Sequence, residues 1–162
     1  MKELLIVRHA NASLNFKSLK DFDRTLNPKG ENESKLMAKQ LLNSNFYPDC
    51  IISSGANRAF STSKIIAKKI NFSINEIKIN DDIYYSSNED IIEIVHNIPN
   101  EYSSIMLVGH NPTLHYLSQM LSGENIISFP TCSMYCISFD VDNWNYAIDG
   151  KKMFFMYPSM FN

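Results

Sequence analysis

The sequence predicts an α/β protein, a three-layer α/β/α sandwich built on a mostly parallel sheet. Short apolar runs typical of buried strands alternate along the chain with longer segments whose apolar residues recur at helical spacing. Strands that alternate with helices form a parallel sheet covered on both faces, which explains why these strands are apolar throughout. The 162 residues contain no Gly/Ser-rich linker and no repeat, so we expect one domain over residues 1–162.

Four strand–helix pairs and two closing strands are expected in chain order. They cover residues 3–7, 28–45, 49–53, 56–69, 74–79, 88–98, 105–108, 112–121, 134–141 and 153–157. The first strand is a compact apolar run that ends at Arg8. The first helix begins where Asn27 can act as N-cap and Pro28 fits the first turn.

The later elements depend on similar signals. Three isoleucines over residues 74–79 favour a short third strand, and Ser87 can form a capping box with Asp90 at the start of the third helix. The fourth strand ends at Gly109, and Pro112 opens the helix that follows it. The tail then alternates or runs apolar over two segments, which predicts two closing strands.

Composition excludes several classes of partner. The formal net charge of −2 and the pI of about 6.1 provide no general positive field for nucleic acid or for an anionic membrane surface. No apolar run reaches the length of a membrane span, and the first apolar stretch is too short for a signal peptide. Three cysteines do not form a disulfide framework, so we expect a reducing, cytoplasmic location.

Two histidines and two arginines fall at predicted strand ends, where α/β sheets bind ligands. His9 follows the first strand beside Arg8, His110 follows the fourth, and Arg58 lies in the first turn of the second helix. Guanidinium groups match the oxygens of a phosphoryl group, and helix amides add positive charge. Each residue alone could be a solvated loop residue, but their common placement predicts a phosphate site.

Four ordered motifs resemble the histidine phosphatase superfamily, specifically its small SixA-type phosphohistidine phosphatase branch. They are Arg8-His9-Ala10, DFDRTLNPKG at 21–30, SSGANRAFST at 53–62 and LVGHNPTL at 107–114. The resemblance implies the phosphoglycerate mutase-like fold, with His9 as the nucleophile and Arg8, Arg58 and His110 as phosphoryl ligands. Neighbouring guanidinium charges would also disfavour the imidazolium form of His9 and keep it nucleophilic.

The resemblance suggests two further phosphate contacts. Asn15 stands six residues after His9, where many members of the family carry a phosphate-binding asparagine, and Thr131 belongs to a Pro-Thr pair like one near family active sites. Asn15 could equally form a turn before the first helix. Thr131 could simply start a strand.

The general acid of mutase-like members has no counterpart where the family carries it. Ile83-Tyr84-Tyr85 occupies that place. Four carboxylates remain possible acids but are better explained as solvated loop or helix-start residues: Asp23, Asp81, Asp82 and Glu89. An alkoxide leaving group usually needs a proton donor, whereas a protonated imidazole leaves a P–N bond readily. The sequence therefore favours a phosphohistidine substrate.

No metal or cofactor is expected. Cys132 and Cys136 on one strand would lie roughly 13 Å apart, too far for shared zinc coordination. Neither nucleotide-binding glycine motif occurs. His96 and His115 point away from the apolar stripes of their helices and are expected to be solvated.

Three functions remain open from the sequence. The first is a cytoplasmic signalling phosphatase that removes phosphate from histidine on a phosphotransfer domain or phosphocarrier protein. The second is a phosphomonoesterase for small sugar or organic acid phosphates, and the third is a phosphate-binding module without turnover. The chain is compatible with a monomer, although sequence does not fix the oligomeric state.

Overall fold

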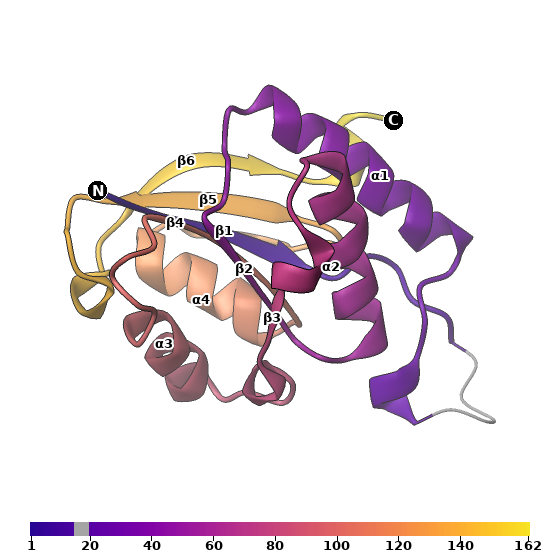
Figure 1. The fold of residues 1–162 in the computed structure, drawn as a ribbon, viewed down its shortest axis with the longest axis horizontal. Coiled ribbons are helices and arrows are strands. Elements are labelled where there is room, and N and C mark those ends of the chain that lie inside the picture. The colour runs from indigo at the N-terminus through magenta and orange to yellow at the C-terminus, as the bar shows by residue number, and fades with distance from the viewer. Residues whose placement is uncertain (15–19) are drawn as a thin grey trace.

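The computed structural model describes residues 1–14 and 20–162, which form a six-stranded sheet with helices on both faces (Figure 1). The strands are β1 (Lys2–Arg8), β2 (Cys50–Ser53), β3 (Lys78–Ile79), β4 (Ser104–Gly109), β5 (Met134–Phe139) and β6 (Lys151–Met156). The helices are α1 (Pro28–Asn43), α2 (Asn57–Lys69), α3 (Asn88–His96) and α4 (Thr113–Ser122). The predicted α/β fold class is confirmed.

The strand order is β3-β2-β4-β1-β5-β6. Strands β3, β2, β4 and β1 pair in parallel, and the two closing strands add antiparallel pairs. In the central pair, Arg8 stands opposite Gly109. Because both strands end there, His9 and His110 leave the sheet side by side at its carboxyl edge.

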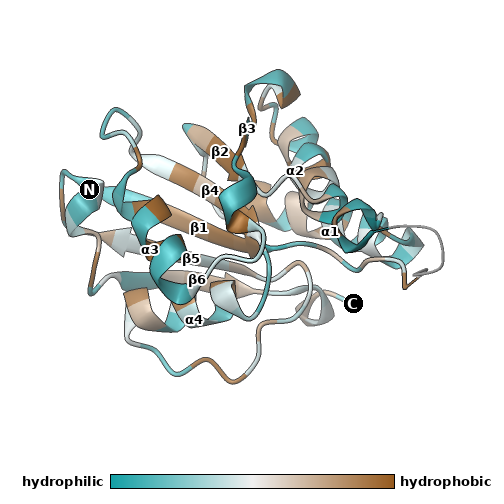
Figure 2. Cartoon of the chain, turned by 90° about the horizontal axis from the view of Figure 1, so that it is seen from below, coloured by the Kyte–Doolittle hydropathy of each residue, from teal (hydrophilic) through white to brown (hydrophobic). Residues whose placement is uncertain are grey.

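Two apolar clusters hold the layers together. Alternate residues of β1 face opposite sides, so Leu4 and Ile6 pack with α3 and α4 while Leu5 and Val7 pack with α1 and α2. Figure 2 shows hydrophobic residues along β1 and β2 in the middle of the molecule and hydrophilic residues on α1. The close packing of both faces of the sheet therefore fixes the positions of the side chains at its edge.

The predicted helix starts are confirmed by their caps. The side chain of Asn27 accepts a hydrogen bond from the Gly30 amide at 2.8 Å, with Pro28 as the first helical residue. Ser87 and Asp90 form the expected capping box, with reciprocal bonds of 3.0 and 3.1 Å. Local hydrogen bonding therefore sets both boundaries.

Three local predictions were wrong. The third strand is only Lys78–Ile79, because residues 74–76 form a short 3-10 turn, and the last two strands end at 139 and 156 rather than 141 and 157. His96 and His115 are half-buried rather than solvated. Their Nε2 atoms hydrogen bond to the carbonyl oxygens of Ala147 and Ile126, at 3.1 and 2.6 Å.

Candidate active site

His9 lies at the carboxyl end of β1 with its ring held by the backbone. Its Nδ1 donates to the carbonyl oxygen of Ala10 at 2.7 Å, because a carbonyl can only accept. The amide of Ala10 in turn donates to Thr62 on α2 at 3.0 Å, which ties this turn to the neighbouring helix. In neutral His9 the proton therefore resides on Nδ1, and Nε2 is unprotonated and carries a lone pair.

The surroundings keep His9 uncharged. Only 8% of the residue is exposed, and burial, followed by the charges of His110, Arg58 and Arg8, lowers the pKa of His9 from 6.5 to about 3. The hydrogen bond to Ala10 opposes this shift but is weaker than burial. At neutral pH the imidazole is a neutral base.

Arg58 lies in the first turn of α2 and links His9 to Asp21. Its Nε donates toward His9 Nε2 at 3.4 Å, while Nη1 and Nη2 donate to the backbone oxygen and the carboxylate of Asp21 at 2.7 and 3.1 Å. These contacts use three of the five guanidinium hydrogens. Two hydrogens of Arg58 thus stay available for an anion.

Asp21 is a site residue that the sequence did not single out. Its carboxylate also accepts from Arg24 at 2.9 Å and from the hydroxyl of Tyr84. The hydrogen bond from Tyr84, followed by the Arg58 and Arg24 charges, lowers the pKa of Asp21. The carboxylate is therefore ionised and serves as an anchor for Arg58. Its motif was visible in the sequence, but its partners were not.

His110 stands beside His9, with ring centroids 5.2 Å apart. Its Nε2 is 2.9 Å from Ser54 Oγ, which already accepts a hydrogen bond from the amide of Ala56. The tautomer of His110 decides which of the two atoms donates in this bond, and Nδ1 of the same ring is buried without a protein partner in the described part of the chain. Burial and then the Arg58 charge lower the pKa of His110 to about 4.

Arg8 completes the cluster. Its Nη1 donates to the carbonyl of Phe129 at 3.0 Å, and burial lowers its pKa without removing its charge. Among the described residues, Arg8 Nε and His110 Nδ1 are buried without a protein partner. The two unpartnered nitrogens belong to residues that the sequence assigned to a phosphoryl group.

Tyr84 occupies the place where an acid was sought. Its ring meets that of His110 edge-on at 5.3 Å and lies 5.9 Å from the guanidinium carbon of Arg58. Burial and the hydrogen bond to Asp21 raise the pKa of Tyr84, so the phenol keeps its proton. Tyr84 was noted from the sequence only because it stands where the family carries its general acid. In the structure its ring lines the site beside His110 and Arg58.

The structure describes one of the two further predicted phosphate contacts. Thr131 donates to the two carboxylate oxygens of the buried Glu33 at 3.1 Å, and Asn15 lies outside the described residues. Of the possible acids, Glu89 lines a cavity of about 550 Å³ that also reaches Arg58 and His110. Asp81, Asp82 and Asp23 do not line that cavity.

Nothing in the described residues suggests a metal centre, since no three His, Cys, Asp or Glu side chains there are grouped to hold an ion. The described residues also include no helix long and apolar enough to cross a membrane.

The structure is thus an α/β protein with two histidines and two arginines gathered at the carboxyl edge of its sheet. The chain belongs to the histidine phosphatase superfamily (branch 1), whose model matches residues 4–102. Membership of this family indicates phosphatase activity through a phosphohistidine. The predicted resemblance to its SixA-like branch is confirmed by the solved structures below.

Similar proteins extend over nearly the whole chain. The SixA protein of Agrobacterium tumefaciens is 26% identical with a TM-score of 0.84, covering 97% of this chain and 98% of that one. A protein histidine phosphatase SixA complexed with tungstate is 22% identical with a TM-score of 0.85 and 99% coverage of both chains. A mycobacterial glucosyl-3-phosphoglycerate phosphatase is 15% identical, with a TM-score of 0.69 and coverage of 95% and 98%.

A plant protein is also similar to this chain. An uncharacterized chloroplastic protein of Arabidopsis thaliana is 29% identical over 154 residues, which are 90% of this chain and 70% of that protein. It adds no functional information.

Proposed function

We propose that this chain is a phosphohistidine phosphatase in which His9 accepts the phosphoryl group and Arg8, Arg58 and His110 bind its oxygens. One observation carries the proposal. His9 is buried and neutral, its Nδ1 proton is held by Ala10, and its Nε2 lone pair faces the guanidinium of Arg58. The nucleophilic Nε2 atom of His9 therefore lies beside the guanidinium of Arg58, which can bind the phosphoryl oxygens.

In the first step, the Nε2 lone pair of His9 forms a bond to phosphorus while the P–N bond of the substrate breaks. The substrate imidazole, protonated at its other nitrogen, leaves as neutral histidine. Arg8, Arg58 and His110, in the tautomer that carries its proton on Nδ1, stabilise the equatorial oxygens during transfer. The charge of phosphorylated His9 is balanced by the phosphoryl group that it carries.

In the second step, water attacks phosphorus and the bond to Nε2 breaks. Inorganic phosphate leaves with the oxygen and one proton of the water, and the other proton goes to solvent. His9 returns to its neutral form, which its low pKa favours.

The protonation states of the groups beside His9 and His110 favour a substrate with a P–N bond. The phenol of Tyr84 donates to Asp21, and the carboxylate of Asp21 is held ionised by its hydrogen bonds, so neither group is set to protonate an alkoxide. Phosphohistidine needs no such donor. A SixA neighbour described as a protein histidine phosphatase supports the same choice. The expected partner is a phosphorylated histidine-phosphotransfer domain or phosphocarrier protein.

Trapping tests the proposal. Phosphorylated histidine peptide is mixed with the protein, the reaction is quenched in alkali, and intact mass with fragmentation locates the phosphoryl group. We expect an acid-labile phosphoryl group on His9, no turnover by His9→Ala, and retained turnover by a matched His96→Asn control. Undiminished hydrolysis by His9→Ala would contradict the proposal.

A small phosphate ester is a second candidate substrate. The cavity of about 550 Å³ beside Arg58 and His110 is within the size range of small-ligand sites, and Glu89 on its wall could supply a proton. The mycobacterial neighbour named for glucosyl-3-phosphoglycerate shows that this fold can serve such chemistry. Turnover of sugar phosphates, lost in Glu89→Gln and without any turnover of phosphohistidine, would favour this candidate.

A further inference from the structure

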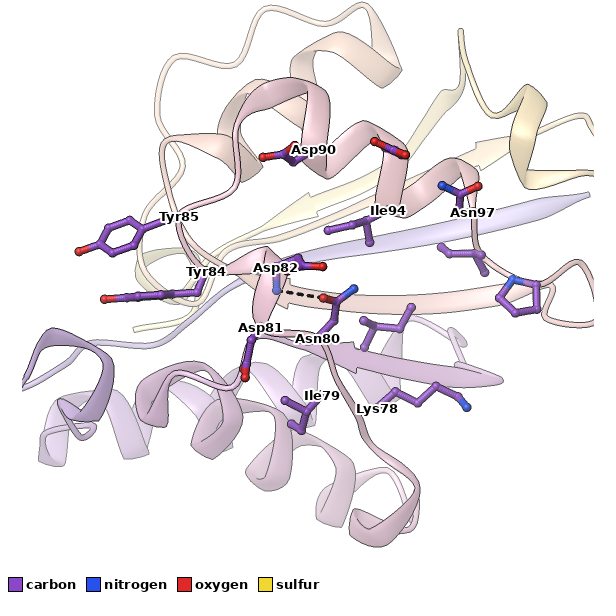
Figure 3. A pocket seen from close by; sticks show the side chains of 14 residues that line it. Lys78, Ile79, Asn80, Asp81, Asp82, Tyr84, Tyr85, Asp90, Ile94 and Asn97 are labelled. Carbon is purple, nitrogen blue, oxygen red and sulfur yellow. Dashed lines mark hydrogen bonds between the residues drawn. The ribbon is translucent and has the colours of Figure 1, made fainter.

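A second cavity lies outside the catalytic cluster, between α3 and the edge strand β3. It encloses about 750 Å³. Figure 3 shows Asp90 and Ile94 on α3 and Asn97 directly after it on one side, with Lys78 and Ile79 on the opposite side. We call this cavity the edge groove.

Apolar side chains form much of the edge groove. Ile52, Ile94 and Ile98 line it and belong to the core on the α3 face of the sheet or pack against that core. Ile79 also lines it, although 46% of this residue is exposed. β3 is the first strand in the sheet order, so only its inner side pairs with a described strand. The groove therefore combines apolar and polar side chains beside an open sheet edge.

The rim of the edge groove is acidic. Asp82, Asp90 and Glu93 line it with Lys78 as the only cation among its lining residues, while Figure 3 shows Asp81 turned away from α3. Within the described residues, neither Asp82 nor Glu93 takes part in an ion pair. Two uncompensated carboxylates beside an apolar floor complement a segment that carries both cations and apolar side chains.

The edge groove adjoins the cavity of about 550 Å³ beside Arg58 and His110, which we call the catalytic cavity. Tyr84 and Tyr85 line both, and the catalytic cavity also contains Arg58 and His110. Tyr85 is 83% exposed and holds a φ of 57°, a left-handed conformation that is costly for a bulky residue. Exposed aromatic rings on a strained backbone are typical of contact sites for a partner.

We propose that the edge groove docks a basic segment with apolar side chains, carried by the phosphorylated protein on which His9 acts. This inference rests on the proposed function. The wall from Asp90 to Asn97 spans about 10 Å of helix, which an extended segment of roughly three or four residues covers. The phosphohistidine would enter the catalytic cavity while its own chain occupies the groove next to it.

Two synthetic peptides test the docking. Each has one histidine, a six-residue Gly/Ser spacer and a tail that alternates leucine with either lysine or glutamine. Fluorescence anisotropy measures binding of the unphosphorylated peptides at low salt, and phosphorylation by phosphoramidate turns them into substrates. The groove variant is Asp82→Asn/Glu93→Gln. Its control is Asp140→Asn/Asp149→Asn, the same charge change at two exposed positions after β5.

We expect wild type to bind the lysine peptide about fivefold more tightly than the glutamine peptide. The groove variant should lose this preference, and the control variant should keep it. With the phosphorylated peptides, wild type should show a lower KM for the lysine peptide than for the glutamine peptide, with the same kcat for both. Equal binding of both peptides by wild type, or equal loss in both variants, would overturn the docking proposal.

Hydrolysis separates this proposal from the proposed function. Binding of the lysine peptide that depends on Asp82 and Glu93, without turnover of either phosphorylated peptide, supports the groove and refutes the phosphohistidine substrate. Turnover of both phosphorylated peptides at equal kcat/KM, without a preference in binding, supports the function and refutes the groove.

Discussion

The two imidazoles of the site should make the fold sensitive to mild acid. His9 and His110 have pKa values of about 3 and 4, compared with 6.5 for the unfolded chain. As the pH falls below 6.5, the unfolded state binds protons that the folded state does not, so stability is complete above about pH 6.5 and is lost toward pH 3.

The magnitude follows from the size of the shifts. Both folded pKa values lie below 5, so going from pH 6.5 to 5 costs at most about 2 kcal/mol for each group, at 1.36 kcal/mol per pKa unit. His9 is only 8% exposed, whereas solvent reaches the half-buried His110 and reduces its share. We therefore expect a combined loss of about 2–3 kcal/mol between pH 7 and 5.

Urea unfolding measures this loss through the single tryptophan, Trp144, which is fully buried. The free energy of unfolding is compared at pH 7 and pH 5 for wild type, for His9→Asn/His110→Asn and for His96→Asn/His115→Asn. The first variant should lose most of the pH dependence, and the second should keep it. An equal loss in wild type and in His9→Asn/His110→Asn would refute the assignment.

Three further changes probe the surroundings of the site. Tyr84→Phe keeps the ring but removes the hydrogen bond to Asp21, so kcat/KM in a phosphatase assay should fall about threefold to tenfold. Gly30→Ala places a Cβ 1.9 Å from the carbonyl oxygen of Asn11, so urea unfolding should show a loss of about 1–3 kcal/mol or more. Glu33→Gln weakens the acceptor of the Asn11 amide, so thermal unfolding should show a stability loss of about 1–2 kcal/mol.

The parts of the fold that sequence predicted well are those set by local signals. The apolar runs before Arg8 and before His110 mark buried strands, and parallel pairing then places the two histidines together. Capping residues set the helix starts in the same way. The length of the third strand was overestimated because its isoleucines fit a strand. In the structure the amides of Glu76 and Ile77 donate to the carbonyl oxygens of Ser73 and Ile74 and close a 3-10 turn instead.

The contacts that hold the site in place could not be predicted from spacing. Asp21 hydrogen bonds to Arg58 and Tyr84, which lie 37 and 63 residues away in the sequence. Glu33 hydrogen bonds to Thr131, which lies 98 residues away. No local pattern encodes such pairs, because they depend on how loops meet after the sheet has formed. The quoted motifs contained Asp21, but its partners became visible only in three dimensions.

The partners of Asp21 explain how the cationic site is kept ordered. Arg8 and Arg58 would repel each other, and burial disfavours the charge on Arg8. The charge of Glu33 offsets part of the burial cost at Arg8. Asp21 accepts hydrogen bonds from Arg58 and Arg24, and its backbone oxygen accepts from the other terminal nitrogen of Arg58. Two carboxylates among three guanidinium groups still leave the cluster positive. Arg58 is therefore aimed at His9 before any phosphoryl group arrives, so little reorganisation remains for the transfer step.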